Sequence, residues 1–357
     1  MTTSQSRHRR RRAQRRRLIR VRLLGALAVL GVVALAVVLL ASSRAHSNAR
    51  RSPLPSLSGR VAAGTPALPR LSQTGLPLST PPLTLAGAGQ AGADPVQVTF
   101  HAPPRAGILI NLDTGQVLWQ RNPYLKVPIA SLTKMMTALV TVESTSPDSL
   151  VLVTKAAINA DGSKVGVLPL GRHVRAQSML YGLLLPSGND AAVALAEKVS
   201  GTVSRFVERM NAEAARLGLG CTRYSSPSGY FDQGNYSCAA DLAELAHIDL
   251  LQPRLASVVR TYAAILPFPI KGGKLYLYNN NPLLIYGYPG LTGMKTGYTE
   301  AAGRCLVATA RRHGIDLAAI VLNSPDPGTQ ARDLLDRGFV DVYHLPPVPE
   351  APLPPGA

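Results

Sequence analysis

The sequence predicts an α/β protein in which strands at both ends of the folded region enclose a long helical stretch. Two strand-like runs, Ala106–Leu112 and Gln116–Gln120, surround a glycine turn and predict a hairpin. Residues 128–250 carry mainly helical spacing of apolar side chains, and strand-like runs return between residues 274 and 322. We therefore expect a sheet flanked by helices, a mostly helical subdomain, and an active site in the cleft between them.

The positive charge of the chain is concentrated before this folded region. The formal net charge is +18, but residues 1–104 hold fifteen arginines and one acid, Asp94. That segment carries +14 and leaves +4 for residues 105–357. Because the folded region is nearly balanced, the charge belongs to the tail and does not predict a nucleic-acid partner.

Residues 23–41 are uncharged and apolar, directly after the arginine-rich residues 1–22. As a helix these residues would span about 28 Å, enough for a thin bilayer. We predict a transmembrane anchor with a basic cytoplasmic tail, and a cleaved signal peptide is the alternative. The expected location is the cell membrane, single-pass with an extracytoplasmic domain, or secretion if the segment is cleaved.

The remaining residues divide into a linker, one domain and a tail. Residues 42–97 are rich in Pro, Ser, Gly and Ala and predict a flexible linker. The domain is expected over residues 98–344 and a proline-rich tail over 345–357. Later helices are predicted at Gln177–Leu185, Asp190–Val199, Phe206–Leu217, Asp241–Leu250 and Thr329–Tyr343, and later strands at Lys274–Tyr278, Leu291–Tyr298, Arg304–Ala310 and Ile315–Leu322.

The chain contains three cysteines, which bear on export and on metal binding. In an exported domain Cys221 and Cys238 are candidates for a disulfide that closes a loop rich in Ser, Gly and Tyr. Cys305 lies in an apolar, strand-like run, and we therefore predict that its thiol is buried. The sequence has no CxxC or HxxxH spacing, so we predict neither a metal site nor a cofactor.

Ser131 and Lys134 are the candidate catalytic pair. After Pro128, helical spacing of apolar residues places Ser131 in the first turn and Lys134 one turn later on the same face. A serine becomes a nucleophile when an adjacent base accepts its proton. A lysine can be that base only if burial or a neighbouring cation lowers its pKa by roughly 3 units.

Two further motifs follow in a fixed order. Ser187-Gly188-Asn189 connects two apolar helices, and Lys295-Thr296-Gly297 lies on a predicted strand. Such a strand would offer a cation, a hydroxyl and backbone N–H groups to the carboxylate and carbonyl of a peptide. The charge of Lys295 would also lower the pKa of Lys134, as a nearby like charge must.

The order S-x-x-K, S-x-N, K-T-G is the motif set of the serine penicillin-recognising enzymes. From about Pro104 to Leu322 the chain resembles the D-alanyl-D-alanine carboxypeptidases, which are low-molecular-mass penicillin-binding proteins. The likeness extends to residues 180–192, Met210-Asn211, residues 217–219, residues 279–284 and residues 295–299. It implies a β-lactamase/transpeptidase-like fold with an antiparallel five-stranded sheet.

The resemblance also implies a role for each motif residue. Ser131 would be the acylated nucleophile, Lys134 its proton acceptor, and Ser187 a proton relay to the leaving amine. Asn189 would hold the lysine and the substrate amide. Lys295 and Thr296 would bind the terminal carboxylate beside Gly297, and the N–H groups of Ser131 and Tyr298 would form the oxyanion hole. The implied partners are peptidoglycan stem peptides ending in D-Ala-D-Ala and β-lactams.

Three alternative functions stay open from the sequence. A class A β-lactamase needs a glutamate after S-x-N, and no E-x-x-x-N pattern occurs between Ser187 and Lys295. A D,D-endopeptidase that cuts cross-links and an inactive penicillin-binding sensor would share the same motifs.

Overall fold

The computed structural model describes residues 83–89, 94–231 and 233–348. These residues belong to one compact unit of the chain. The predicted tail at residues 1–22 and the predicted anchor at 23–41 lie outside them. Among the helices that are described, none combines the length and apolar character needed to cross a membrane.

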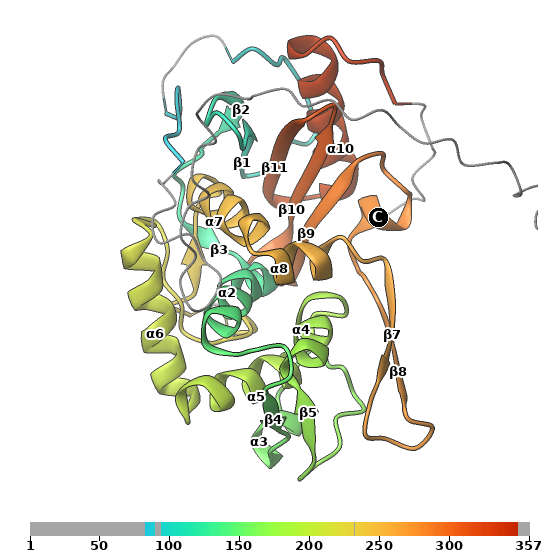
Figure 1. Cartoon of the computed structure of the whole chain (residues 1–357). Helices are drawn as coiled ribbons and strands as arrows, with labels where there is room; N and C mark the ends of the chain where they lie inside the picture. Colours follow the sequence, from blue (N-terminus) through green and yellow to red (C-terminus); the bar gives the residue numbers. More distant parts are fainter. Residues whose placement is uncertain (1–82, 90–93, 232, 349–357) are drawn as a thin grey trace, which may run out of the picture. The chain divides into compact units, whose positions relative to one another are not determined.

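One five-stranded antiparallel sheet forms the frame of the domain, as predicted (Figure 1). Its strand order is β2-β1-β11-β10-β9. The bounds are β1 Ala106–Asn111, β2 Val117–Arg121, β9 Leu291–Thr299, β10 Gly303–Arg312 and β11 Ile315–Ser324. The N-terminal hairpin thus pairs with the last strand of the chain, and β9 is an edge strand.

Both faces of the sheet are covered by helices (Figure 1). Alternate residues of β1 enter different cores: Ile108 and Ile110 pack with the helical region, whereas Leu109 packs with α10 (Pro327–Arg337). Because side chains alternate across a strand, a continuous apolar run such as residues 108–110 is what a sheet covered on both faces requires.

The helical region follows β2 and contains the predicted helices with bounds shifted by a few residues. The main helices are α2 Lys134–Ser144, α4 Ala176–Leu184, α5 Asn189–Ser200, α6 Val203–Arg216, α7 Ala239–Leu251 and α8 Pro253–Val259. Shorter elements connect them: β3 Val127–Pro128, η2 Ala130–Thr133, β4 Leu150–Leu152, α3 Lys155–Ile158, β5 His173–Arg175, β6 Tyr236–Ser237, β7 Ala263–Pro267, β8 Lys274–Tyr278 and α9 Pro282–Ile285.

The end of the last helix and the end of the linker differ from the sequence prediction. The helix predicted to run to Tyr343 is α-helical only as far as Arg337, and residues Gly338–Val342 form a π-helical turn. A Cβ on Gly338 would lie 2.8 Å from the side chain of Leu317. Residues 83–89, predicted as linker, pack on the domain: Leu83 N donates to Glu244, and Ala86 bridges to the start of β2. The flexible linker therefore does not extend through these residues.

Candidate active site

Ser131 lies at the start of the helical region, against the edge strand β9. It sits in the 3₁₀ turn η2, directly before α2, and not in the first turn of the α-helix as predicted. The reason is local: Ala130 has a φ of 48°, which an α-helix does not accommodate. The i,i+3 spacing of the motif nevertheless brings its two side chains together.

Lys134 is the first residue of α2 and its side chain is fully buried. Its Nζ lies 2.8 Å from Ser131 Oγ and 2.8 Å from the carbonyl oxygen of Ser228. Burial lowers the pKa of Lys134 well below its usual value, and the charge of Lys295 lowers it further, while Asp190 acts in the opposite direction. The amine is therefore held next to the hydroxyl in an environment that favours the uncharged form.

The Ser228 carbonyl oxygen, which accepts the hydrogen bond from Lys134, belongs to a turn that the sequence did not predict as part of the site. Gly229 has a φ of 73°, and a Cβ there would overlap the carbonyl oxygen of Ala130. Asn235 Nδ2 donates to Thr133 Oγ1 at 2.8 Å from the far end of the same loop. The run Ser226-Pro227-Ser228-Gly229 signals a turn, but a backbone carbonyl leaves no side-chain signature of its use.

Ser187 and Asn189 lie on the connection between α4 and α5. Ser187 has a φ of 66° and a buried Oγ, which makes no hydrogen bond within the described residues. Asn189 Nδ2 donates to the carbonyl oxygen of Asp161, and its Oδ1 is likewise without a partner there. The hydrogen bonds of Lys134 Nζ in the described residues go to Ser131 and Ser228, and the predicted contact of Asn189 with the lysine stays a prediction.

Strand β9 carries the third motif along the other side of the serine. Lys295 is buried, its Nζ donates to the carbonyl oxygen of Thr296 at 2.7 Å, and burial lowers its pKa to about 7. A Cβ on Gly297 would lie 3.0 Å from the Ile129 carbonyl oxygen and 3.2 Å from the Ser131 nitrogen. A larger residue would push these atoms apart, so glycine favours the close approach of the edge strand to the serine.

These elements enclose a cleft of about 450 Å³. It is lined by Ser131, Ser163, Ser187, Asn280, Pro282, Ile285, Tyr286, Thr296, Gly297, Tyr298, Arg304, Cys305, Leu306 and Pro327. The buried Cys305 predicted from the sequence lies on β10, where it pairs with Gly297 of β9. Residues of all three motifs thus line one cleft, and the side chains of Lys134 and Lys295 are buried.

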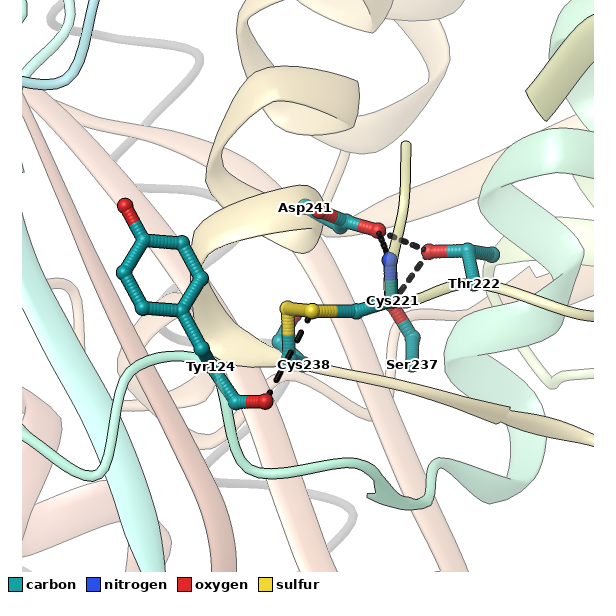
Figure 2. Close-up of a disulfide and its surroundings, with 6 residues drawn as sticks. All are labelled: Tyr124, Cys221, Thr222, Ser237, Cys238 and Asp241. Atoms are coloured by element: carbon teal, nitrogen blue, oxygen red, sulfur yellow. Dashed lines mark hydrogen bonds between the residues drawn. A yellow bond between two sulfur atoms is a disulfide. The ribbon is translucent and has the colours of Figure 1, made fainter. Parts of the chain in front are cut away.

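One group of potential metal ligands is present in the described part of the chain: Cys221, Cys238 and Asp241. Its two sulfurs are bonded to each other as a disulfide, which joins the two cysteines that the sequence proposed as a pair (Figure 2). Because a disulfide sulfur is not a thiolate, these residues do not make a metal site in this state.

The antiparallel sheet, the helical region and the serine–lysine pair in the cleft define the class of the penicillin-recognising serine enzymes. The family model described as D-alanyl-D-alanine carboxypeptidase matches residues 95–326. The chain belongs to this family, as the sequence resemblance predicted.

Relatives and solved structures agree with that assignment. The chain is 35% identical over 243 residues to the D-alanyl-D-alanine carboxypeptidase DacF of Bacillus subtilis, covering 66% of this chain and 62% of the relative. It is 36% identical over 257 residues to DacB2 of Mycobacterium tuberculosis, covering 70% and 86%. The crystal structure of the Streptomyces K15 DD-transpeptidase aligns with a TM-score of 0.64 at 31% identity, covering 68% of this chain and 100% of that one.

Proposed function

We propose that this protein is a serine-type D-Ala-D-Ala carboxypeptidase, which removes the terminal D-alanine from peptidoglycan stem pentapeptides and is acylated by β-lactams on Ser131. One observation carries the proposal: the buried amine of Lys134 lies 2.8 Å from Ser131 Oγ, and its pKa is lowered by burial and by Lys295. A neutral amine at this distance can accept the hydroxyl proton.

Acylation begins when Ser131 Oγ attacks the carbonyl carbon of the penultimate D-alanine and Lys134 accepts its proton. The oxyanion that forms is stabilised by the N–H groups of Ser131 and Tyr298, and removal of one such donor costs roughly 3 kcal/mol of barrier in other enzymes. Ser187, whose buried Oγ has no partner among the described residues, relays the proton that Lys134 accepted to the leaving amine, so Lys134 becomes neutral again. The C–N bond breaks and D-alanine departs.

Substrate recognition uses the edge strand and the α4–α5 connection. The charged form of Lys295 pairs with the terminal carboxylate, assisted by the hydroxyl of Thr296. The partnerless Oδ1 of Asn189 accepts a hydrogen bond from the substrate amide. A peptide carboxylate entering the cleft therefore binds in the orientation that presents its last amide bond to Ser131.

Deacylation returns the serine by the same chemistry. Water attacks the ester carbonyl, Lys134 accepts its proton, and the stem tetrapeptide leaves with Ser131 protonated again. We expect the β-lactam adduct to persist, because the sequence lacks the glutamate that a class A β-lactamase uses to activate water.

The cellular setting is also a proposal. We propose that residues 23–41 anchor the protein in the cell membrane and that the catalytic domain lies outside, where peptidoglycan is built and cell shape is maintained. The apolar run behind a block of arginines supports this topology. Secretion follows if the segment is cleaved.

Release of D-alanine from a synthetic stem pentapeptide tests the proposed activity. We expect stoichiometric D-alanine and tetrapeptide from the wild type and none from Ser131→Ala. Two stem peptides joined by a cross-link serve as a parallel substrate, because cleavage of this substrate alone would identify an endopeptidase. Absence of both products with an acylated serine would identify a penicillin-binding sensor instead.

A further inference from the structure

The Cys221–Cys238 disulfide closes the loop whose Ser228 carbonyl oxygen accepts a hydrogen bond from Lys134. The two cysteines are 17 positions apart, and Cys238 directly precedes α7 (Figure 2). Ser228 lies between them in the sequence. A covalent bond at the base of this loop therefore limits where its carbonyl groups can be.

The loop makes successive contacts with the catalytic segment. The carbonyl oxygen of Ser228 accepts from Lys134 Nζ at 2.8 Å, and that of Pro227 accepts from Thr137 Oγ1 at 2.6 Å. Thr137 lies one turn beyond Lys134 on α2. The loop thus fixes the face of α2 that carries the base.

The base of the loop also contacts the segment that enters the site from the other side. β6, which ends at Ser237, pairs with β3 (Val127–Pro128), three residues before Ser131. The Cys221 sulfur lies 3.6 Å from the Tyr124 carbonyl oxygen. Figure 2 draws this contact as a dashed line. The disulfide therefore contacts the segment before Ser131 and closes the loop that contacts Lys134.

Polar contacts at the same place are weaker restraints than the covalent bond. Asp241 Oδ2 accepts from Cys221 N at 2.8 Å and from Thr222 Oγ1 at 2.6 Å (Figure 2). Each of these bonds exchanges with water when the loop opens, whereas a disulfide keeps the two ends adjacent in every conformation.

We propose that the Cys221–Cys238 disulfide is a positioning element of the active site, which holds the Ser228 carbonyl oxygen against the amine of Lys134. The inference rests on the function proposed above. Neither cysteine touches the reacting atoms, so the disulfide acts through the loop. Its loss lets the loop move away from the lysine and lets water reach the amine.

The expected signature is a change in pH dependence. Burial is the largest cause of the lowered pKa of Lys134, with Lys295 from β9 as the second and Asp190 from α5 opposing both. Access of water weakens the effect of burial and leaves the charges of Lys295 and Asp190 in place, so the pKa of Lys134 rises. At a fixed pH below that pKa, a rise of one unit lowers the fraction of neutral base, and hence the acylation rate, about tenfold.

The experiment measures the second-order rate of acylation by a fluorescent penicillin from pH 5 to 10, with the full-length chain and its Cys221→Ser/Cys238→Ser variant. We expect the acid limb of the variant's profile to lie at higher pH than that of the wild type, so that at each pH on that limb the variant is acylated more slowly, by about tenfold for every unit of displacement. Leu335→Ala is the matched control, because it opens a cavity in the core beneath α10, away from the loop.

Reduction of the wild type provides the same comparison without a mutation. A phosphine reduces the disulfide to two thiols and is itself oxidised to the phosphine oxide, with water supplying the oxygen and the protons. After removal of the phosphine the acylation rate should fall, and reoxidation should restore it. This comparison decides the question if the double variant does not fold.

An unchanged rate and pH profile in the folded double variant, or in the reduced wild type, overturns the inference. The same pH shift in Leu335→Ala also overturns it, because a general loss of stability would then be the cause. Failure of the oxidised wild type to become labelled at all would reject the proposed function, which is a different result.

Discussion

Replacement of Lys295 by arginine should change the alkaline side of the pH–rate profile. Burial lowers the pKa of Lys295 to about 7, so the free protein loses this charge as the pH rises through 7. The substrate carboxylate requires the charged form, and kcat/KM reports the free enzyme. Because the charged fraction falls about tenfold per pH unit, kcat/KM should be limited to roughly 1% of its full value by pH 9.

An arginine at this position keeps its charge throughout the range, since its pKa exceeds about 12. The alkaline decline of kcat/KM should therefore disappear in Lys295→Arg. The acid limb should remain, because Lys134 still has to lose its proton. In the wild type a bound carboxylate favours the charged lysine, so the alkaline limb of kcat should lie at higher pH than that of kcat/KM.

The assay is D-alanine release from a stem pentapeptide at several substrate concentrations, between pH 5 and 10. Lys295→Met is the matched control and should show a low kcat/KM at every pH, since it offers the carboxylate no cation. An alkaline limb in Lys295→Arg with the wild-type midpoint would refute the reasoning, because the limb would then arise from another group.

Three other perturbations follow from the same geometry. Lys134→Ala should lower the rate of penicillin acylation by about 10²- to 10⁴-fold, and an unchanged rate would show that another group is the base. Gly297→Ala places a Cβ 3.0 Å from the Ile129 carbonyl oxygen, so β9 must move from Ser131 and acylation should fall about tenfold with little change in melting temperature. The pKa of Glu143 is raised to about 7, chiefly by burial. The folded protein therefore binds a proton at Glu143 more readily than the unfolded chain does, and this contribution to the free energy of unfolding is lost as the pH rises through 7. Glu143→Gln should therefore gain about 1 kcal/mol over the wild type at pH 8 and almost nothing at pH 5, measured by urea unfolding, and an equal gain at both values would exclude this cause.

The strands and helices with strong periodicity could be predicted from the sequence. β8 begins and ends where the pattern placed it, at Lys274 and Tyr278, because alternating side chains of a two-stranded hairpin leave a clear period. α8 and β7 were not predicted. The apolar residues of Leu255–Val259 and Ala263–Leu266 are short runs that fit either a helix or a strand, and tertiary packing decides between them.

The proximity of the three motifs could also be predicted, since their order and residue types carry the chemistry. What the sequence could not give is the set of contacts made by backbone atoms. The bond from Lys134 to the Ser228 carbonyl joins residues 94 positions apart, and every residue has such a carbonyl. The 3₁₀ turn at Ser131 was missed for a similar reason, because it depends on the backbone of Ala130.

The most direct test of the account is mass spectrometry of the protein after exposure to a β-lactam. The adduct should lie on the tryptic peptide Val127–Lys134, on Ser131, and should be absent from Ser131→Ala. An adduct on any other peptide, or none on a folded protein, would contradict the assignment of Ser131 as the nucleophile that Lys134 activates.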